Sequence, residues 1–350
     1  MLEKGGNNIP DMSIYNVCKH LSIIGFALLL IMGFSACEDK FVDPVPDLNT
    51  LKNFPVIDVH QHIYSTTNFP SRGDPFPYQT FATPAAHYDA LVKRMKDNNI
   101  VLAIAGGPPE AIDYFYTNYP ENHSFFWYSG EYATIDESVL PARLSSLKDA
   151  IREKKIKSFG ELLGIYNGLA LNDPFNMQLY AIADSFALPV FIHTGIVPDF
   201  VYENFPDYAF DASNPANLKP VLEQYPDVNF NAAHIGISIH RDYDFEDDVL
   251  DLMHVYDNFY VDIAGTIIFW ESKGEKQTAR FIKRAIEEGV QDKILYGSDE
   301  MIWPDAITSS INYIKQADYL TDTVKKQILY WNAARYLKLS EEEIAGHFGN

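Results

Sequence analysis

Two histidines lie two residues apart at the end of the first apolar run of the sequence, Ile57–His62. Side chains two residues apart on a strand share a face, so Asp58, His60 and His62 are expected to point the same way. Two imidazoles at this spacing can bind one cation, and a carboxylate below them can fix the tautomer of an imidazole. Because the chain holds ten histidines, this pair alone is weak evidence for a metal site.

Four more residues of the same chemistry end later apolar runs. They are Glu161 in Gly160–Leu162, His193 in Phe191–Gly195, His234 in Ala232–Gly236, and Asp299 in Leu295–Asp299. An unpaired carboxylate such as Glu161 would be costly in a buried strand. Any one of these residues alone is usually a structural group that bonds to nearby backbone. Six of them at matched positions predict one site for a divalent ion such as Zn²⁺, Mn²⁺ or Fe²⁺.

These residues need a fold that brings the ends of several strands to one mouth. From Pro55 onward, short apolar runs alternate with helical patterns at intervals of roughly 25–45 residues, the scale of a βαβ unit. We expect strands at Val56–Val59, Val101–Ala105, Ser124–Tyr128, Ser158–Leu163, Val190–His193, Asn229–His234, Tyr260–Ala264 and Ile294–Tyr296. We expect helices at Tyr88–Met95, Ala142–Lys155, Phe175–Phe186, Asp247–Val255, Thr278–Glu288 and Asp322–Leu337. One unbroken series of eight units predicts an α/β fold, a (β/α)8 TIM barrel over residues 55–350, with the metal site at the carboxyl ends of its strands.

The first 54 residues are expected to precede the barrel as a signal and a tether. The apolar run Leu21–Phe34 has the length of a signal-peptide core and is too short to span a bilayer as a helix. The following Ser35-Ala36-Cys37 resembles the lipobox of bacterial lipoproteins, with Phe34 where leucine is usual. We therefore predict a lipoprotein signal peptide at 1–36, lipidation of Cys37, and a tether at 37–54. The protein would be an exported lipoprotein on the periplasmic side of a bacterial membrane or at the cell surface; a plain membrane anchor or an uncleaved signal is the alternative.

Composition limits what the chain binds. There are 48 acidic and 27 basic residues, and the net charge of −21 argues against nucleic acid and against adhesion to anionic lipid. Membrane contact is therefore expected through the lipid anchor only. Of the two cysteines, Cys18 lies in the predicted signal and Cys37 is expected to carry lipid, so a cysteine nucleophile is excluded from the barrel.

As an ordered set, the motifs resemble those of the amidohydrolase superfamily. They follow one another as Asp58–His62, Gly160-Glu161, His193–Gly195, His234–Gly236 and Gly297–Asp299. The resemblance is to the amidohydrolase-related branch of metal-dependent hydrolases that includes aminocarboxymuconate-semialdehyde decarboxylase. The closing Trp331–Leu337 resembles the terminal helix of that branch, and the match spans Pro55–Leu339.

The resemblance implies roles for five of these residues. His60, His62 and His193 would bind the metal ion. Asp299 would join them and would also handle the proton. His234 would hold a second ion or orient the water. A homodimer is a further expectation, since barrels of this type commonly pair.

Glu161 decides how many ions the site holds. Many two-metal members of the superfamily bridge the ions with a carboxylated lysine on the fourth strand, where this chain has Glu161; Lys157 lies only at the beginning of that strand. Glu161 can bridge two ions in the same way, or it can lie beside a single ion, and the sequence leaves both arrangements open. The expected cofactor is one or two divalent ions, most simply Zn²⁺.

The leading hypothesis for function is hydrolysis of a small-molecule amide, ester or lactone by metal-activated water. The first alternative is metal-dependent, non-oxidative decarboxylation of an unsaturated or aromatic carboxylic acid. The second is a lipid-anchored binding protein without catalysis. Candidate substrate contacts are Arg72 and Arg241, which could clamp a carboxylate, and Trp270 and Trp303, which could line the pocket.

The segment Ile196–Pro215 is rich in aromatic residues. It is expected to be a long loop without regular structure. Its rings would either cover the substrate as a lid or pack the loop onto the barrel.

Overall fold

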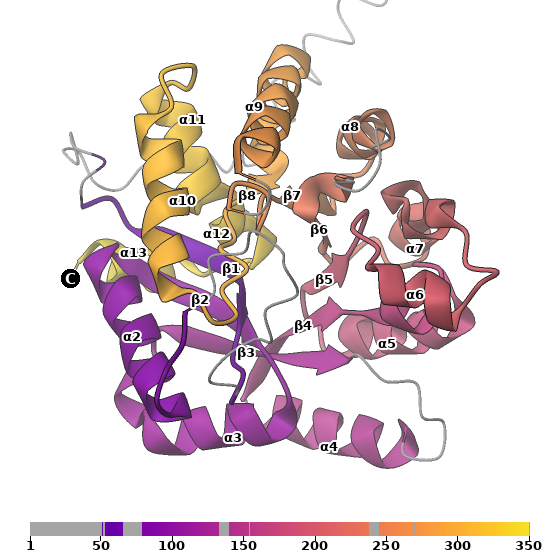
Figure 1. Cartoon of the computed structure of the whole chain (residues 1–350), viewed down its shortest axis with the longest axis horizontal. Coiled ribbons are helices and arrows are strands. Elements are labelled where there is room, and N and C mark those ends of the chain that lie inside the picture. Colours follow the sequence, from indigo (N-terminus) through magenta and orange to yellow (C-terminus); the bar gives the residue numbers. More distant parts are fainter. Residues whose placement is uncertain are drawn as a thin grey trace, which may run out of the picture. The chain divides into compact units, whose positions relative to one another are not determined.

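Eight parallel strands form one sheet in sequential order, β1 to β8, which confirms the predicted TIM barrel (Figure 1). The computed structural model describes residues 51, 53–65, 79–132, 140–153, 155–237, 245–268 and 271–349. The strands are β1 (Val56–His62), β2 (Ile100–Gly106), β3 (Phe126–Tyr132), β4 (Ile156–Leu162), β5 (Val190–His193), β6 (Phe230–Ala233), β7 (Phe259–Asp262) and β8 (Ile294–Leu295). Each overlaps its predicted range. The predicted signal peptide, most of the tether, and Cys37 lie outside the described residues.

The barrel closes where the last strand meets the first. The backbone N–H of Val59 donates to the carbonyl of Tyr296 at 3.0 Å. Beyond β8, the N–H of Asp299 donates to the carbonyl of His60 at 2.8 Å, and the N–H of His62 donates to the carbonyl of Glu300 at 2.8 Å. This seam brings the end of β8 directly against the metal-binding motif of β1.

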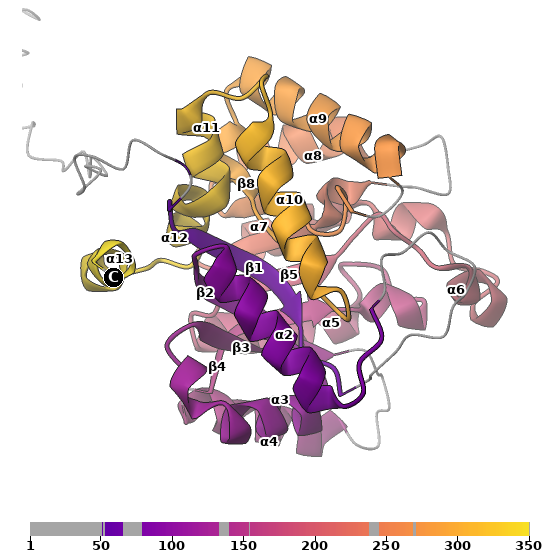
Figure 2. The same cartoon turned by 60° about the vertical axis from the view of Figure 1, so that its left-hand side comes forward.

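Helices follow the strands and surround the barrel (Figures 1 and 2). They are α2 (Pro84–Asp97), α3 (Pro109–Asn118), α4 (Leu140–Arg152), α5 (Pro174–Ser185), α6 (Asp199–Asn204), α7 (Lys219–Gln224), α8 (Glu246–Val255), α9 (Glu271–Glu288), α10 (Pro304–Gln316), α11 (Asp322–Lys326), α12 (Asn332–Tyr336) and α13 (Glu341–Phe348). All six predicted helices are present. The last of them is divided by the π-helical turn η7 (Gln327–Trp331). Helices α3, α6, α7, α10 and α13 were not predicted.

Helix α2 shows how local sequence builds these units. The hydroxyl of Thr83 accepts the N–H of Ala86 at 3.1 Å and caps the helix start, where Pro84 has no N–H to leave unsatisfied. Tyr88, Leu91 and Met95 recur at three- and four-residue spacing and are buried. Burial of each such side chain contributes about 1.5–3 kcal/mol. The helix lies beside α10 (Figure 2).

The expectation of an unstructured loop over Ile196–Pro215 is wrong. This segment forms α6 and the 3₁₀ turn η3 (Phe210–Ser213). The Phe200 ring meets Tyr166 edge-on at 5.4 Å, and the Phe210 ring stacks on Phe245 at 4.9 Å between centroids. These two rings pack the segment onto the barrel, because aromatic pairs at these separations are attractive.

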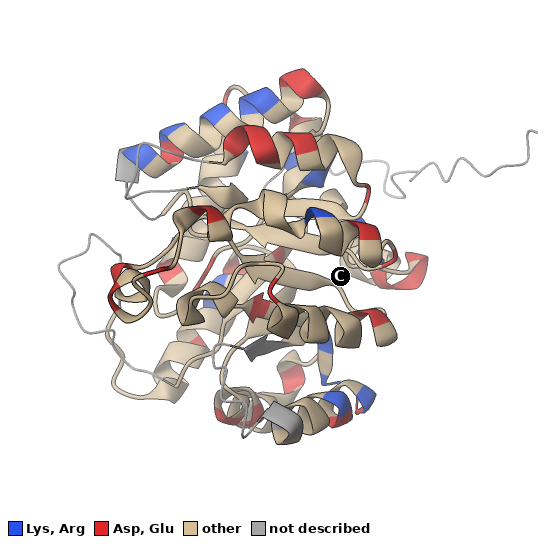
Figure 3. Cartoon of the chain, turned by 90° about the vertical axis from the view of Figure 1, so that its right-hand side faces the viewer, with Lys and Arg blue, Asp and Glu red and all other residues tan. Residues whose placement is uncertain are grey.

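Charged residues lie largely on the outer helices, with both signs interspersed (Figure 3). Within the described part of the chain, none of the helices is both long enough and apolar enough to cross a membrane.

Candidate metal centre

The structure brings all six predicted metal ligands into one buried cluster, and none of them is more than 4% exposed. They come from β1 (His60, His62), β4 (Glu161), the end of β5 (His193), the residue after β6 (His234) and the turn after β8 (Asp299). The Nε2 atoms of His60 and His62 lie 3.2 Å apart. The Oδ1 atom of Asp299 lies 3.5 Å from the first and 3.2 Å from the second.

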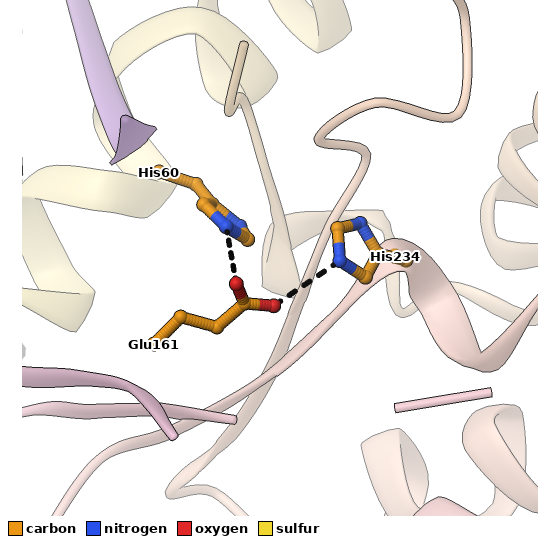
Figure 4. A group of neighbouring side chains, drawn as sticks. All are labelled: His60, Glu161 and His234. Carbon is orange, nitrogen blue, oxygen red and sulfur yellow. Dashed lines mark hydrogen bonds and ion pairs between the residues drawn. The ribbon is translucent and has the colours of Figure 1, made fainter. Parts of the chain in front are cut away.

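Glu161 lies at the middle of the cluster. Its Oε2 atom is 3.5 Å from Nε2 of His60 and 3.4 Å from Nε2 of His62. Its Oε1 atom is 2.6 Å from Nδ1 of His193 and 3.2 Å from Nε2 of His234. Figure 4 shows the carboxylate with one oxygen directed to His60 and the other to His234. Glu161 therefore divides the four histidines into two pairs, one at each oxygen.

Each of the four histidines uses one ring nitrogen outside the cluster and directs the other into it. The outer contacts are His60 Nδ1 to Asp262 (3.1 Å), His62 Nδ1 to the Tyr64 hydroxyl (3.2 Å), His234 Nδ1 to the Ala264 carbonyl (2.8 Å) and His193 Nε2 to the Ile196 carbonyl (2.7 Å). Metal-binding histidines are held in this way, because the outer bond fixes the tautomer and leaves the inner nitrogen's lone pair for the ion.

Three groups of the cluster shift one another's pKa values. Burial opposes protonation of His60, but the carboxylates of Glu161 and Asp262 outweigh it and hold the pKa of His60 well above its usual value. Burial favours the neutral form of Glu161, yet His193 and His60 hold the pKa of Glu161 well below its usual value. Burial likewise opposes protonation of His234, and its hydrogen bond to Glu161 raises the pKa of His234. A divalent cation that binds here would therefore displace protons from imidazole rings.

The donor set fits a metal ion. Two groups of three buried donors have ligand atoms within 4.8 Å of one another. One group is His60, Glu161 and His234. The other shares His60 and adds His62 and Asp299. In addition, the buried Oδ1 atom of Asp299 makes no hydrogen bond, although it faces two imidazole nitrogens. Buried carboxylate oxygens are costly without a partner, and a cation would supply one.

Asp262 at the end of β7 was missed by the sequence analysis. It is fully buried and accepts hydrogen bonds from His60 Nδ1, from Asn231 Nδ2 (2.7 Å) and, through Oδ1, from the backbone N–H groups of His234 and Ala264. The same signal that singled out Glu161, an acid in an otherwise apolar strand, would have found it.

The expectation that Asp58 fixes a histidine tautomer is wrong, because Asp262 holds the His60 ring instead. The Asp58 carboxylate accepts from the backbone N–H groups of His60 (3.2 Å) and Ser298 (2.9 Å) and from the Gln61 amide (2.7 Å). Burial raises the pKa of Asp58 to about 6, against these hydrogen bonds, which lower it.

We expect Asp262→Asn to raise the dissociation constant for zinc about 10–100-fold. The oxygen of the new amide must remain on the two backbone N–H groups, so the NH₂ group of that amide faces His60 and forces the proton of the imidazole onto Nε2. Isothermal titration with zinc measures the change. Asp58→Asn is the matched control, since Asp58 is equally buried but contacts the backbone of His60 rather than its ring; we expect its zinc affinity to stay within about threefold. Equal losses in the two variants would refute the orienting role of Asp262.

The predicted substrate contacts are mostly not visible. Arg72, Arg241 and Trp270 lie outside the described residues. Trp303 is 1% exposed at the start of α10 and packs with Ala306, so its contact with a substrate stays a prediction. The structure also places the half-buried Tyr166 beside the cluster, with its ring edge-on to His193 at 5.0 Å.

Comparison with known proteins places these features in a family. The family model described as amidohydrolase matches residues 57–339. Protein fluG of Emericella nidulans is 22% identical over an alignment of 169 residues that covers 44% of this chain and 18% of fluG. The chain thus matches only a small part of that relative.

Solved structures share the fold. A probable 2-pyrone-4,6-dicarboxylic acid hydrolase from Acinetobacter baumannii with bound citric acid is 18% identical, with a TM-score of 0.53 over 81% of this chain and 99% of its own. An amidohydrolase from Burkholderia multivorans with bound zinc is 11% identical, with a TM-score of 0.54 over 82% of this chain and 100% of its own. At these identities the likeness concerns the fold alone.

Proposed function

Since the chain belongs to the amidohydrolase family of enzymes, we propose that it is a metal-dependent hydrolase of a small-molecule amide, ester or lactone. The observation that carries the proposal is the position of Glu161, whose two carboxylate oxygens face separate pairs of histidines. This arrangement supports a centre for two ions with Glu161 between them. His60, His62 and Asp299 would hold one ion, and His193 and His234 the other.

When bound, divalent ions lower the pKa of water towards neutrality and polarise a substrate carbonyl. The protein's own residues would orient and move the proton. The buried Asp299 carboxylate faces the cluster, with its Oδ1 atom free of hydrogen bonds, so we assign this carboxylate as the acceptor of the water proton and its donor to the leaving group. Asp262 and Tyr64 would keep the rings of His60 and His62 oriented throughout.

The proton acceptor Asp299 is also our reason for preferring hydrolysis over decarboxylation. Decarboxylation needs a cationic clamp for the substrate carboxylate and requires no acceptor for a water proton. The described part of the cluster offers the acceptor, Asp299. The proposed cationic clamps, Arg72 and Arg241, lie outside the described residues.

Zinc is the metal that we propose. Imidazole and carboxylate donors suit zinc, and a chain with the same fold was solved with zinc bound.

Metal removal and reloading tests the proposal. The protein without residues 1–37 would be stripped with chelator and reloaded with zinc. Inductively coupled plasma mass spectrometry would measure its metal content. Its hydrolytic activity would be measured on a panel of lactones, esters and amides. We include a 2-pyrone because one chain of this fold carries the name of a 2-pyrone hydrolase. We expect two ions per chain and hydrolysis that returns only with metal. One ion per chain would remove Glu161 as a bridge. Release of carbon dioxide from an unsaturated or aromatic carboxylic acid, without hydrolysis of the panel, would favour the decarboxylase. Failure to bind any ion would refute both.

We also propose that the protein is exported and anchored through lipid on Cys37. The support is the apolar run before the lipobox-like Phe34–Cys37. Metabolic labelling with palmitate should tag the wild type and not Cys37→Ala; equal labelling would refute the anchor.

A further inference from the structure

A buried acid–imidazole pair lies directly behind the metal cluster. Glu300 follows Asp299 in the chain, and its Oε1 atom accepts a hydrogen bond from Nε2 of His87 on α2 at 2.9 Å. Both side chains are fully buried. Neither residue belongs to the ligand set, and the proposed chemistry uses neither.

Glu300 holds the segment that carries Asp299. Its carbonyl accepts the N–H of His62 at 2.8 Å, its N–H donates to the Ser298 hydroxyl at 3.2 Å, and its Oε1 also accepts the N–H of Trp303 at 2.9 Å. One residue thus connects β1, the turn after β8, the start of α10 and, through His87, helix α2.

The segment needs such support because its backbone is unusual. Asp299 has a φ of 55°, in the left-handed region that residues other than glycine rarely adopt. Conformations of this kind are strained for such residues and persist where the surroundings hold them in place. The hydrogen bond from the Asp299 N–H to His60 fixes one side of this turn, and Glu300 fixes the other.

The pair is poorly built as a stabiliser. The second carboxylate oxygen of Glu300, Oε2, and the second ring nitrogen of His87, Nδ1, are buried without hydrogen-bond partners. Each unsatisfied atom of this kind costs stability, and apolar side chains would fill the same space without that cost. The bonds that the pair does make converge on the turn beside Asp299, which indicates positioning rather than packing.

We propose that Glu300 and His87 are positioning residues, which hold the Asp299 carboxylate against His60 and His62. The consequence for metal binding and turnover rests on the proposed function. The geometric part of the proposal, that the pair keeps the turn from Gly297 to Trp303 ordered, does not depend on the proposed function.

The test compares Glu300→Ala and Glu300→Gln with a control of similar burial. The glutamine variant retains an oxygen that can accept from both His87 and Trp303, whereas the alanine variant loses both bonds. The control is Asn258→Ala. Asn258 is buried at the opposite end of the barrel, where it donates to three carbonyls, so its loss should lower thermal stability without reaching the site.

The first readout is hydrogen–deuterium exchange in the metal-free protein. We expect the peptide that covers Gly297–Trp303 to exchange at least about tenfold faster in Glu300→Ala. The Trp303 amide loses its acceptor, and the turn that holds the Ser298 amide on Asp58 and the Asp299 amide on His60 loses its support. Glu300→Gln and Asn258→Ala should match the wild type in this peptide. His87→Phe should show the same change as Glu300→Ala in smaller degree. Unchanged exchange in Glu300→Ala would overturn the proposal whether or not the wild type binds metal.

The second readout is zinc affinity. We expect Glu300→Ala to weaken it about tenfold and to lower kcat with KM nearly unchanged, while Glu300→Gln restores both and Asn258→Ala changes neither. If Asn258→Ala lost as much zinc affinity as Glu300→Ala, Glu300 and His87 would have only a structural role. A wild type that binds no zinc would instead refute the proposed function.

Discussion

We expect His60→Ala to lose both bound metal and hydrolytic activity. His60 belongs to both donor groups of the cluster, and its Nε2 atom faces His62, Glu161 and Asp299. Its removal takes a donor from each group and leaves the buried carboxylates of Glu161, Asp262 and Asp299 without this imidazole. Loss of an outer bond alone costs about 10–100-fold in affinity, so loss of this ligand should exceed about 100-fold. Metal content after gel filtration and turnover of the best substrate measure the two effects.

His254→Ala is the control for this variant. His254 lies on α8, is exposed, and bonds to Glu288 rather than to the cluster. It should retain the wild-type metal content and rate. Full metal content in His60→Ala would contradict a centre built on β1.

The second large effect is expected for Asp299→Asn. The amide keeps the size of the carboxylate but cannot accept a proton at neutral pH. General acid–base groups contribute about 10²–10⁴ to the rate, so kcat should fall by that factor with KM changed about threefold at most. Single-turnover kinetics on protein of known metal content separates proton transfer from metal loss.

Asp305→Asn serves as its control. Asp305 lies in the first turn of α10 and pairs at the surface with Arg94, so the rate of the Asp305→Asn variant should stay at the wild-type level. A rate for metal-loaded Asp299→Asn within about tenfold of the wild type would show that another group takes the proton.

Sequence periodicity predicted the barrel because each strand is a short apolar run that the sheet buries on both faces. It also predicted that Glu161 and His193 meet, since parallel strands end at one mouth. It could not predict the seam, which depends on backbone hydrogen bonds between residues far apart in sequence, such as Asp299 and His60.

Some local signals were present but unused. The Ser340-Glu343 spacing forms a capping box at the start of α13, and proline at the first turn marks α3 and α10. The role of Asp262 required the fold, because His60 lies some two hundred residues earlier in the chain. Nothing in the sequence pattern singles out Glu300. An acid after Asp299 in a turn has the pattern of a solvated residue, and only the fold, which places His87 of α2 against it, shows that it is buried.

The seam between β1 and β8 also sets the order in which the site can be made. His60 and His62 are synthesised near the start of the barrel, and Asp299 near its end. A chain that has emerged only in part, from the ribosome or from an export channel, lacks the carboxylate that faces both imidazoles until β8 has joined β1. An early nascent chain would offer a cation only part of its final donors. Selective retention of the metal would thus be a property of the finished barrel, and a truncated or stalled product would release it.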